Sequence, residues 1–451
     1  MALHREVQSR VTQESEKVVI VGIDFGTSFT KVYFNQEGNI KQPLKFNVNG
    51  KQSYFLPTEL YYDPASNKVF FDKTSDRECL KYFKYSMINN DLVTSETLAK
   101  NNPDMNPKAE FLCSIYYLAS LIKEIKIQVA GILKTSKIKY SFNMGCPIDN
   151  WSNKNKNSYD IVLKLGYKLN EEGFEDGMTL EKLYAFYADN KDITFPNLQT
   201  VPELYAEALW FIEQPSTGEG IYTILDIGGG TVDFASIFVS RTADGEKKTT
   251  IYSQNVMPLG VEVLLQFMYP DRYEEHRAEC IEELKTRKVV MPFGWVESIH
   301  GTNRKLKKAH EFDVKFANDG IGEVKERNSK LMDEQLKKGH IPYYAFGGGA
   351  DFQWYHSIID SHKRAFERAN IPPLKKQPLV LDRIPDNRLI IAEQLTRSSF
   401  PEIDGFPWHF VRETLFSGID RNGDETYETT RKSTLDYHFA LEDRQKEIYG
   451  D

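Results

Sequence analysis

Two stretches of the chain share one pattern of apolar and polar positions. Residues 18–34 (VVIVGIDFGTSFTKVYF) predict an apolar strand, a Gly-Thr-Ser turn and a second strand, because β-branched and aromatic residues fill both arms and a glycine interrupts them. Residues 221–239 (IYTILDIGGGTVDFASIFV) repeat this layout, and their alignment pairs Asp24 with Asp226. A repeat spaced about 200 residues apart is too long for a solenoid, and it predicts two similar domains that face each other.

The other apolar segments alternate between helix and strand patterns. Residues 108–133 carry apolar side chains at helical spacing and predict a long buried helix, and residues 137–148 predict a strand that ends at Pro147. Further helices are predicted at residues 178–190, 201–213, near 273–288 and from about Asp351, and a strand precedes the glycine-rich turn at 347–349. This alternation indicates an α/β fold with mixed sheets.

Composition indicates an ordinary globular protein. The chain has 451 residues, 40% of them hydrophobic, which is enough for a large core in two or more domains. Its net charge of −8 is spread without a basic block, so no nucleic-acid partner is expected. The first 17 residues lack the apolar core of a secretory signal, and no window resembles a membrane span. Four widely spaced cysteines are typical of reduced thiols, and we expect a soluble cytoplasmic protein.

The glycine-rich turns carry the candidate chemistry. A nucleotide triphosphate is held by backbone N–H groups that approach it closely, which requires glycine, and by hydroxyls and a metal ion. Each turn follows an aspartate at a strand end, Asp24 or Asp226, where a carboxylate can hold hydrated Mg²⁺. The candidate phosphate-binding residues of the two turns are Gly26, Thr27, Ser28, Gly228, Gly229, Gly230 and Thr231. Neither GxxxxGK[ST] nor GxGxxG occurs at these sites, which argues against a P-loop or dinucleotide fold.

These motifs resemble those of the actin-like ATPase superfamily. DFGTSFTKV is similar to its first phosphate motif, DIGGGTVDF to its second and FGGGADF to its adenosine motif. Three further segments resemble the nucleotide-binding domain of the seventy-kilodalton heat-shock chaperones, namely PLGVEVLLQF at 258–267, GCPIDNW at 145–151 and VPELYAEALWF at 201–211. The resemblance covers roughly residues 18–416. It implies an α/β fold of the duplicated actin-like, ribonuclease H-like type, with two lobes around a nucleotide cleft.

The resemblance also implies a division of the chain. The expected parts are a polar extension at 1–17, lobe I at 18–214 with a small subdomain at about 50–107, lobe II at 215–416 with a small subdomain at about 258–340, and a polar tail at 417–451. The heat-shock family continues with an apolar linker and a β-rich substrate domain. This chain ends about 35 residues after the ATPase fold should end, so a self-sufficient refolding chaperone is not expected.

Residue roles follow from the resemblance. Asp24 and Asp226 would position Mg²⁺ through its waters, and Asp226 would also orient the attacking water. Glu203 would hold or polarise that water, although a surface position on its helix is the open alternative. The segment KYFKYSM makes Lys84 the candidate for the lysine that reaches the γ-phosphate, with Lys81 as a rival and a solvated lysine as the alternative.

The third turn and the end of the second motif complete the candidate site. Gly347, Gly348 and Gly349 form the nucleotide-binding turn of the adenosine motif, and the resemblance places the last two against the ribose and adenine. Asp233, which closes the second motif, is a candidate ligand for a monovalent ion or an ordinary strand-end cap.

The inventory predicts Mg²⁺-dependent ATP binding with slow hydrolysis, because phosphoryl transfer needs positioning and charge stabilisation more than covalent chemistry. The favoured interpretation is that ATP binding and hydrolysis operate a chaperone-like, nucleotide-gated switch for an unidentified protein partner. The alternative is a filament-forming actin relative for segregation or scaffolding, since Lys31 resembles a lysine of plasmid-segregation and cell-division actins. A small-molecule kinase of the same fold is a third possibility, but no substrate motif is visible.

Overall fold

The computed structural model describes most of the chain as two compact units. The described residues are 16–36, 39–89, 92, 94–147, 156–241, 245, 247–273, 275–289, 308, 309, 311–313, 315–361, 363–381, 383–398 and 400. Unit 1 takes residues 1–210 and 381–399, and unit 2 takes 211–380 and 400–451. The tail predicted at 417–451, nearly all of the N-terminal extension, and the end of the 145–151 segment lie outside the described residues.

Unit 1 is built on a mixed sheet with the order β12-β10-β1-β2-β3, in which β6 also pairs with β2. Its strands are β1 (Lys17–Phe25), β2 (Phe29–Gln36), β3 (Ile40–Pro43), β6 (Leu56–Pro57), β10 (Ile138–Cys146) and β12 (Leu198–Pro202). The last seven residues of β1 are all buried, as expected for a central strand covered on both faces. Strands β1, β10 and β12 run parallel, so their carboxyl ends meet at one edge of the sheet.

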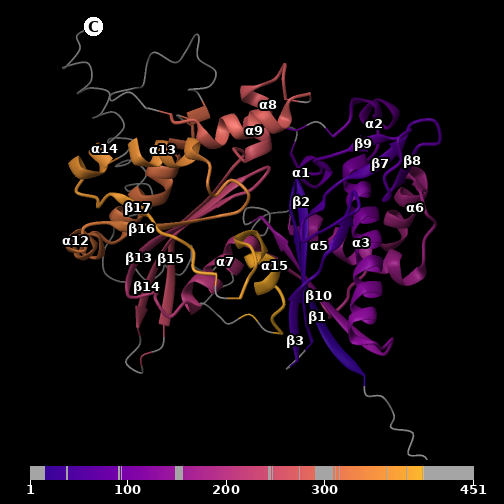
Figure 1. Cartoon of the computed structure of the whole chain (residues 1–451), viewed down its shortest axis with the longest axis horizontal. Helices are drawn as coiled ribbons and strands as arrows, with labels where there is room; N and C mark the ends of the chain where they lie inside the picture. The colour runs from indigo at the N-terminus through magenta and orange to yellow at the C-terminus, as the bar shows by residue number, and fades with distance from the viewer. Residues whose placement is uncertain are drawn as a thin grey trace, which may run out of the picture. The chain divides into compact units, whose positions relative to one another are not determined.

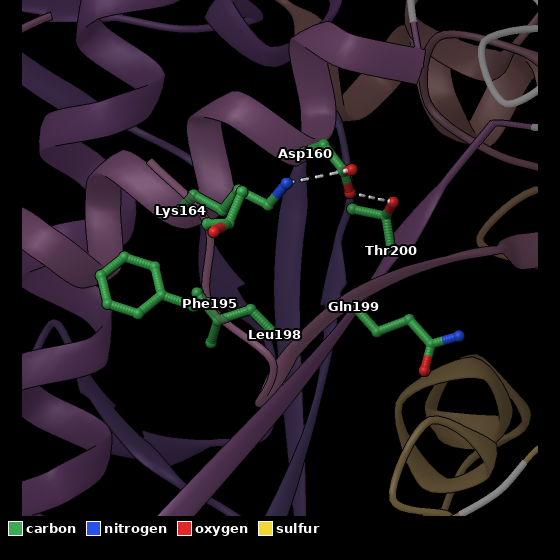
Figure 2. Close-up of a pocket in the computed structure, with 7 residues that line it drawn as sticks. Asp160, Lys164, Phe195, Leu198, Gln199 and Thr200 are labelled. Carbon is green, nitrogen blue, oxygen red and sulfur yellow. Dashed lines mark hydrogen bonds and ion pairs between the residues drawn. The ribbon is translucent and has the colours of Figure 1, made fainter. Parts of the chain in front are cut away.

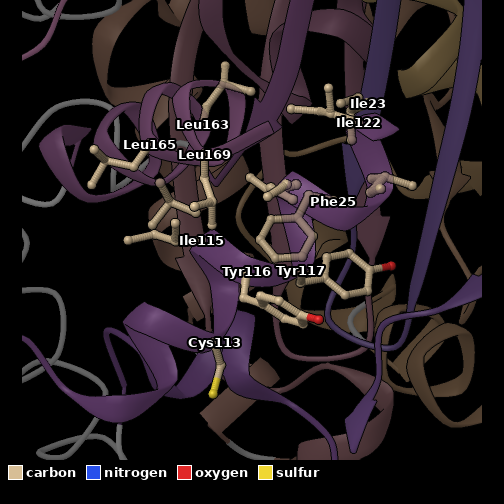
Figure 3. Close-up of a cluster of buried hydrophobic side chains, with 14 of the residues drawn as sticks. Ile23, Phe25, Cys113, Ile115, Tyr116, Tyr117, Ile122, Leu163, Leu165 and Leu169 are labelled. Carbon is tan, nitrogen blue, oxygen red and sulfur yellow. The ribbon is translucent and has the colours of Figure 1, made fainter. Parts of the chain in front are cut away.

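Helices cover both faces of this sheet. Helices α3 (Ala109–Leu133) and α5 (Lys156–Glu172) pack on the face that carries Ile23 and Phe25, and Figure 3 shows the side chains of these elements in one cluster. The short elements η2 (Asn387–Leu389) and α15 (Ile390–Gln394) lie against the other face.

Smaller elements complete unit 1 (Figure 1). A four-stranded sheet has the order β11-β8-β7-β9, and β4 pairs with β5. These strands are β4 (Phe46–Val48), β5 (Lys51–Ser53), β7 (Leu60–Asp63), β8 (Lys68–Phe70), β9 (Glu78–Leu80) and β11 (Met178–Thr179). The remaining helices are α1 (Phe83–Ser86), α2 (Glu96–Asn101), α6 (Leu180–Asn190) and α7 (Glu203–Glu213), whose last residues belong to unit 2.

Unit 2 repeats the sheet of unit 1. Its order is β15-β14-β13-β16-β17, in which β13 runs antiparallel to β14 and parallel to β16, as β1 does to β2 and β10. The strands are β13 (Gly220–Ile227), β14 (Val232–Arg241), β15 (Lys247–Met257), β16 (Ile341–Phe346) and β17 (Leu374–Lys376). Two units with the same strand order and directions form the duplicated actin-like, ribonuclease H-like α/β fold.

Helices pack on the unit 2 sheet as well. They are α8 (Val261–Met268), α9 (Arg277–Thr286), the π-helix η1 (Lys315–Gly322), α11 (Glu323–Arg327), α12 (Ser329–Lys337), α13 (Gln353–Ser361) and α14 (Lys363–Arg368). One core cluster joins Ile221 of β13 to residues of η1, α11, α12 and α14. Across the part of the chain that the structure describes, no helix has the length and apolar character needed to span a membrane.

Two differences from the sequence expectation concern the start of a helix and the border between the units. The helix predicted from residue 201 begins at Glu203, because residues 198–202 pair with β10 as strand β12. Residues 381–399, expected in lobe II, belong to unit 1, because η2 and α15 pack on its sheet. The two small subdomains stay predictions.

Candidate functional site

Two predicted site residues and one glycine that was not predicted lie at the carboxyl edge of the unit 1 sheet. Asp24 lies near the end of β1, Gly145 near the end of β10, and Glu203 directly after β12. A Cβ atom on Gly145 would lie only 2.9 Å from Cγ of Glu203, so glycine is needed there for the glutamate to occupy its position. Carboxyl ends of parallel strands are the usual place for ligand binding in open α/β sheets.

Glu203 forms a buried ion pair with Lys84. The Lys84 Nζ atom lies 3.2 Å from Oε1 of Glu203. Lys84 comes from α1, which packs on α3 through the contact between Phe83 and Tyr117. The rival Lys81 lies instead near Glu59, with 44% of its side chain exposed. The structure therefore brings Lys84, and not Lys81, to the predicted hydrolytic glutamate.

Each side chain of this ion pair affects the pKa of the other. Burial alone would lower the pKa of Lys84, but the charge of Glu203, with smaller contributions from Tyr159 and Asp24, raises it above the usual lysine range. The lysine therefore stays protonated. Burial raises the pKa of Glu203, and the Lys84 ammonium opposes that rise. A carboxylate with a raised pKa is suited to accept a proton at neutral pH.

The first phosphate turn joins β1 to β2. Asp24 and Lys31 stand opposite each other in the strand register, and Lys31 Nζ lies 2.7 Å from Asp24 Oδ2. A Cβ atom on Gly26 would lie 2.4 Å from the carbonyl oxygen of Phe29, so the tight turn requires glycine. Thr27 is buried in the turn. Lys31 was not among the predicted site residues, although its position opposite Asp24 in the hairpin is a signal that could have found it.

The hairpin that carries the second turn, in unit 2, has the same strand register as the hairpin of unit 1, but the charges of the opposed side chains differ. Asp226 stands opposite Asp233, where unit 1 places a lysine opposite an aspartate. Thr231 Oγ1 donates to Asp233 Oδ2 at 2.8 Å. Directly opposed carboxylates repel each other unless a cation or a proton lies near them. The two buried aspartates therefore suit a cation.

The carbonyl groups of the second turn are held by the start of α8. The bonds run from the N–H groups of Gly260, Val261 and Glu262 to the oxygens of Gly230, Gly228 and Gly229, at 3.1, 2.9 and 2.8 Å. Within the described residues, the N–H groups of Gly229 and Gly230 donate to no backbone acceptor. Since a planar trans peptide points its N–H away from its C=O, these amides are directed away from α8, as the amides of an anion-binding nest are directed away from their carbonyls.

The third turn lies against Asp226. Gly347 has φ of +80°, and a Cβ atom there would lie 2.2 Å from Asp226 Oδ1. The Gly349 N–H donates to the Ile227 carbonyl at 2.9 Å. Gly348 is exposed, and its Cβ would meet nothing within 4 Å. Unit 2 thus brings the predicted adenosine turn to the predicted metal and water residue.

Two side chains that the sequence motifs do not mark hold this third turn. The Ala350 carbonyl lies 2.7 Å from Lys376 Nζ and 2.6 Å from His356 Nε2. His356 is buried, and its Nδ1 lies 2.9 Å from the Tyr343 hydroxyl. Burial, and then the nearby Lys376 charge, lower the pKa of His356, so the imidazole is neutral at neutral pH.

Another buried carboxylate lies next to the second turn. Glu262, in the first turn of α8, is bound by Arg277 and by the Tyr273 hydroxyl. Tyr355 donates to the Leu259 carbonyl at 2.8 Å, which ties α13 to the start of α8. None of these residues was predicted as a site residue, because their pairing depends on how α8, α9 and α13 pack.

A polar hollow of about 200 Å³ lies elsewhere in unit 1. Figure 2 shows Asp160 and Lys164 of α5 on one side of it and Gln199 and Thr200 of β12 on the other. None of its lining residues is a predicted site residue. Its carboxylate is already bonded to Lys164 and Thr200.

The side chains that could bind a metal ion can be compared with the preferences of the expected Mg²⁺. Among the described residues, no three His, Cys, Asp or Glu side chains group as a metal site. Mg²⁺ usually keeps several waters and binds through one or two carboxylates, so single aspartates such as Asp24 and Asp226 suit it. The roles of Asp24, Lys84, Glu203, Asp226 and Asp233 stay predictions.

Comparisons with known proteins find similarity among solved structures. No protein-family model matches the chain, and no curated protein matches it. Among solved structures, the chain is similar to MreB5 of Spiroplasma citri bound to ADP, with 13% identity and a TM-score of 0.42 over 90% of this chain and 99% of that one. It is also similar to MreB 5 of Spiroplasma citri bound to AMPPNP, with 12% identity and a TM-score of 0.43 over 91% and 100%. The duplicated actin-like fold rests on the strand order of the chain's own two units.

Proposed function

We propose that the chain binds Mg·ATP through its two phosphate turns and hydrolyses it slowly. The observation that carries this proposal is the duplicated hairpin: each unit ends its central strand with a buried aspartate and a glycine turn. A Gly-rich turn by itself is ordinary. Two in the same register, with Gly347 packed on Asp226, support a site for a triphosphate and its metal.

Four predicted residues have a place in the proposed hydrolysis. Glu203 holds the attacking water and accepts its proton, helped by the raised pKa that burial produces. The charged Lys84 beside it stabilises negative charge on the phosphoryl group. Asp24 and Asp226 would hold the waters of Mg²⁺, and the bound ion would supply charge that offsets the phosphates.

The pairing of Lys31 with Asp24 supports the filament alternative over the chaperone-like switch. Lys31 occupies the register position opposite Asp24. It resembles the lysine that plasmid-segregation and cell-division actins carry after their first phosphate turn. We propose that nucleotide state controls self-association of the chain. A nucleotide-gated switch for another protein is the second candidate, and the same experiment separates the two.

Asp226→Asn tests the site. The substitution keeps the shape of the side chain and removes its charge, so hydrolysis should be abolished while the fold is retained. Phosphate release and circular dichroism measure the two effects. Asp333→Asn, at an exposed position of α12, is the matched control and should hydrolyse ATP like the wild type. Turnover at the wild-type rate in Asp226→Asn would refute the assignment.

Sedimentation tests the use of hydrolysis. The purified chain should form larger assemblies with ATP, or with ATP in the Glu203→Gln variant, than with ADP, because a ligand shifts a population only through differential affinity. Unchanged size with a nucleotide-dependent bound partner would favour the switch. The same size and the same partners in ATP and ADP would contradict both nucleotide-controlled self-association and the nucleotide-gated switch. The small-molecule kinase hypothesis would then be tested by a substrate screen.

A further inference from the structure

The first phosphate turn is held by a relay of hydroxyl groups. The Tyr117 hydroxyl donates to Thr30 Oγ1 at 2.9 Å, and Thr30 Oγ1 lies 2.9 Å from Thr58 Oγ1. Thr58 Oγ1 in turn donates to the Gly26 carbonyl at 2.8 Å. A threonine hydroxyl has one proton, and Thr58 gives its proton to Gly26, so Thr30 is the donor in the middle bond. The relay therefore runs in one direction, from helix α3 to the turn.

The relay lies inside the core of unit 1. Thr30 is fully buried and Thr58 is 1% exposed. The ring of Tyr117 stacks on Phe25, with centroids 5.5 Å apart, and both rings are visible in Figure 3. Burial raises the pKa of Tyr117, so its phenol keeps the proton that starts the relay. Water cannot easily replace these bonds, and losing one leaves a polar group without its partner.

Thr58 controls the orientation of two peptide groups. Its side chain holds the carbonyl of Gly26, and its own N–H donates to the Ser28 carbonyl at 3.0 Å. In a planar trans peptide the C=O and the next N–H point in opposite directions. With the Gly26 oxygen directed to Thr58, the Thr27 N–H is directed away from Thr58.

Unit 2 holds the equivalent peptide by other means. Gly228 aligns with Gly26, and its carbonyl accepts a hydrogen bond from the Val261 N–H at the start of α8. In each unit, the equivalent carbonyl group of the turn thus accepts a hydrogen bond from a residue outside the hairpin. Unit 1 uses the Thr58 side chain where unit 2 uses a helix backbone.

We propose that Thr58 is a positioning residue for the nucleotide phosphates, and that it couples the first phosphate turn to the small sheet of unit 1. This inference rests on the proposed ATP site. Thr58 lies two residues before β7, and Lys84 lies in α1, which follows β9. The small sheet therefore begins beside one phosphate-facing element and ends beside another. A displacement of that sheet would reach both the turn and the Lys84–Glu203 pair.

Thr58→Val and Thr58→Ser test the proposal in the full chain. Valine keeps the shape and removes the hydroxyl, whereas serine keeps the hydroxyl. Thr58→Val should weaken MgATP and MgADP binding about tenfold, the range for a lost hydrogen bond that leaves a carbonyl without its donor. It should also speed hydrogen exchange of peptides that cover residues 24–31 and 55–61. Thr58→Ser should restore both. Titration calorimetry and exchange mass spectrometry measure the two effects.

Thr223→Val is the matched control, because Thr223 is also a fully buried threonine but lies in β13 of unit 2. It should leave both measurements unchanged. Unchanged exchange in Thr58→Val would overturn the hold on the turn, and faster exchange with unchanged nucleotide affinity would overturn the role in phosphate binding. A wild-type chain that binds no nucleotide would contradict the proposed function and the phosphate role together, whereas the exchange data would still decide whether Thr58 holds the turn.

Discussion

Single residues of the candidate site act through buried charge. The side chains of Lys84 and Glu203 are 5% and 9% exposed. A buried ion pair is weak evidence for stability. Removing one partner, however, leaves the other charge buried without compensation and typically lowers the free energy of unfolding by about 3–5 kcal/mol. Variants at these positions must therefore be judged by hydrolysis, nucleotide binding and unfolding together.

Glu203→Gln should lower ATP hydrolysis about 10²-fold or more with little loss of ATP affinity, because the amide keeps the shape but cannot accept the proton of water. Phosphate release under single-turnover conditions and a binding isotherm provide the comparison. Lys84→Ala should lower hydrolysis in the same way. Glu213→Gln, on the exposed end of α7, should behave as wild type. If binding and turnover fall equally in Glu203→Gln, the residue is structural.

At the scale of elements, each glycine turn follows a strand and depends on a close approach. The three turns differ in what approaches them: the Phe29 carbonyl at Gly26, the start of α8 at the second turn, and Asp226 at Gly347. Gly347 is the most constrained of the third turn, because φ of +80° disfavours any side chain and the aspartate leaves no room for one.

Gly347→Ala should destabilise unit 2 by at least about 1–2 kcal/mol, the cost of a left-handed conformation for a residue with a Cβ, and should also weaken ATP binding by displacing Asp226. Gly348→Ala is the matched control in the same turn, since its Cβ would meet nothing within 4 Å. Denaturant unfolding and calorimetry compare the two variants. Equal effects at both positions would show that Asp226 does not depend on the packing of Gly347.

At the scale of the whole molecule, the chain passes between the units twice, once within α7 and once near residue 380. The returning segment is bound to the unit 1 sheet. Asn143 Nδ2 donates to the Leu395 carbonyl at 2.7 Å, and Asn35 Nδ2 to the Thr396 carbonyl at 3.3 Å. Gly22 allows this contact, because a Cβ there would lie 2.1 Å from the Ala392 carbonyl.

Gly22→Ala should therefore lower the stability of unit 1 by about 1–3 kcal/mol, as overpacking against backbone usually does, and should expose the 383–398 segment to protease. Gly131→Ala provides the contrast. Its position in α3 is exposed, with nothing within 4 Å of the added Cβ, so alanine should raise stability by up to about 1 kcal/mol. Denaturation midpoints and limited proteolysis test both. A Gly22→Ala chain as stable and resistant as wild type would mean that α15 docks loosely.

Much of the fold was predictable because its signals are local. The hairpins at 18–34 and 221–239, the helix α3 and the strand before the third turn all appear where the sequence pattern predicts them. Strand β12 was missed because five residues carry little pattern, and its pairing with β10 makes it a strand. Helix α5 was missed although its buried side chains recur at helical spacing.

The sequence by itself determined the duplication, the three glycine turns and the aspartates that precede two of them, because glycine and β-branched residues act on the backbone next to them. Only the tertiary structure decided which distant side chains meet. It places Lys84 rather than Lys81 at Glu203, and Gly145 beneath that glutamate. It also returns residues 381–399 to unit 1. These choices depend on how α1, β10 and α15 pack on shared faces, and packing between segments that are distant in the sequence leaves no signal in local periodicity.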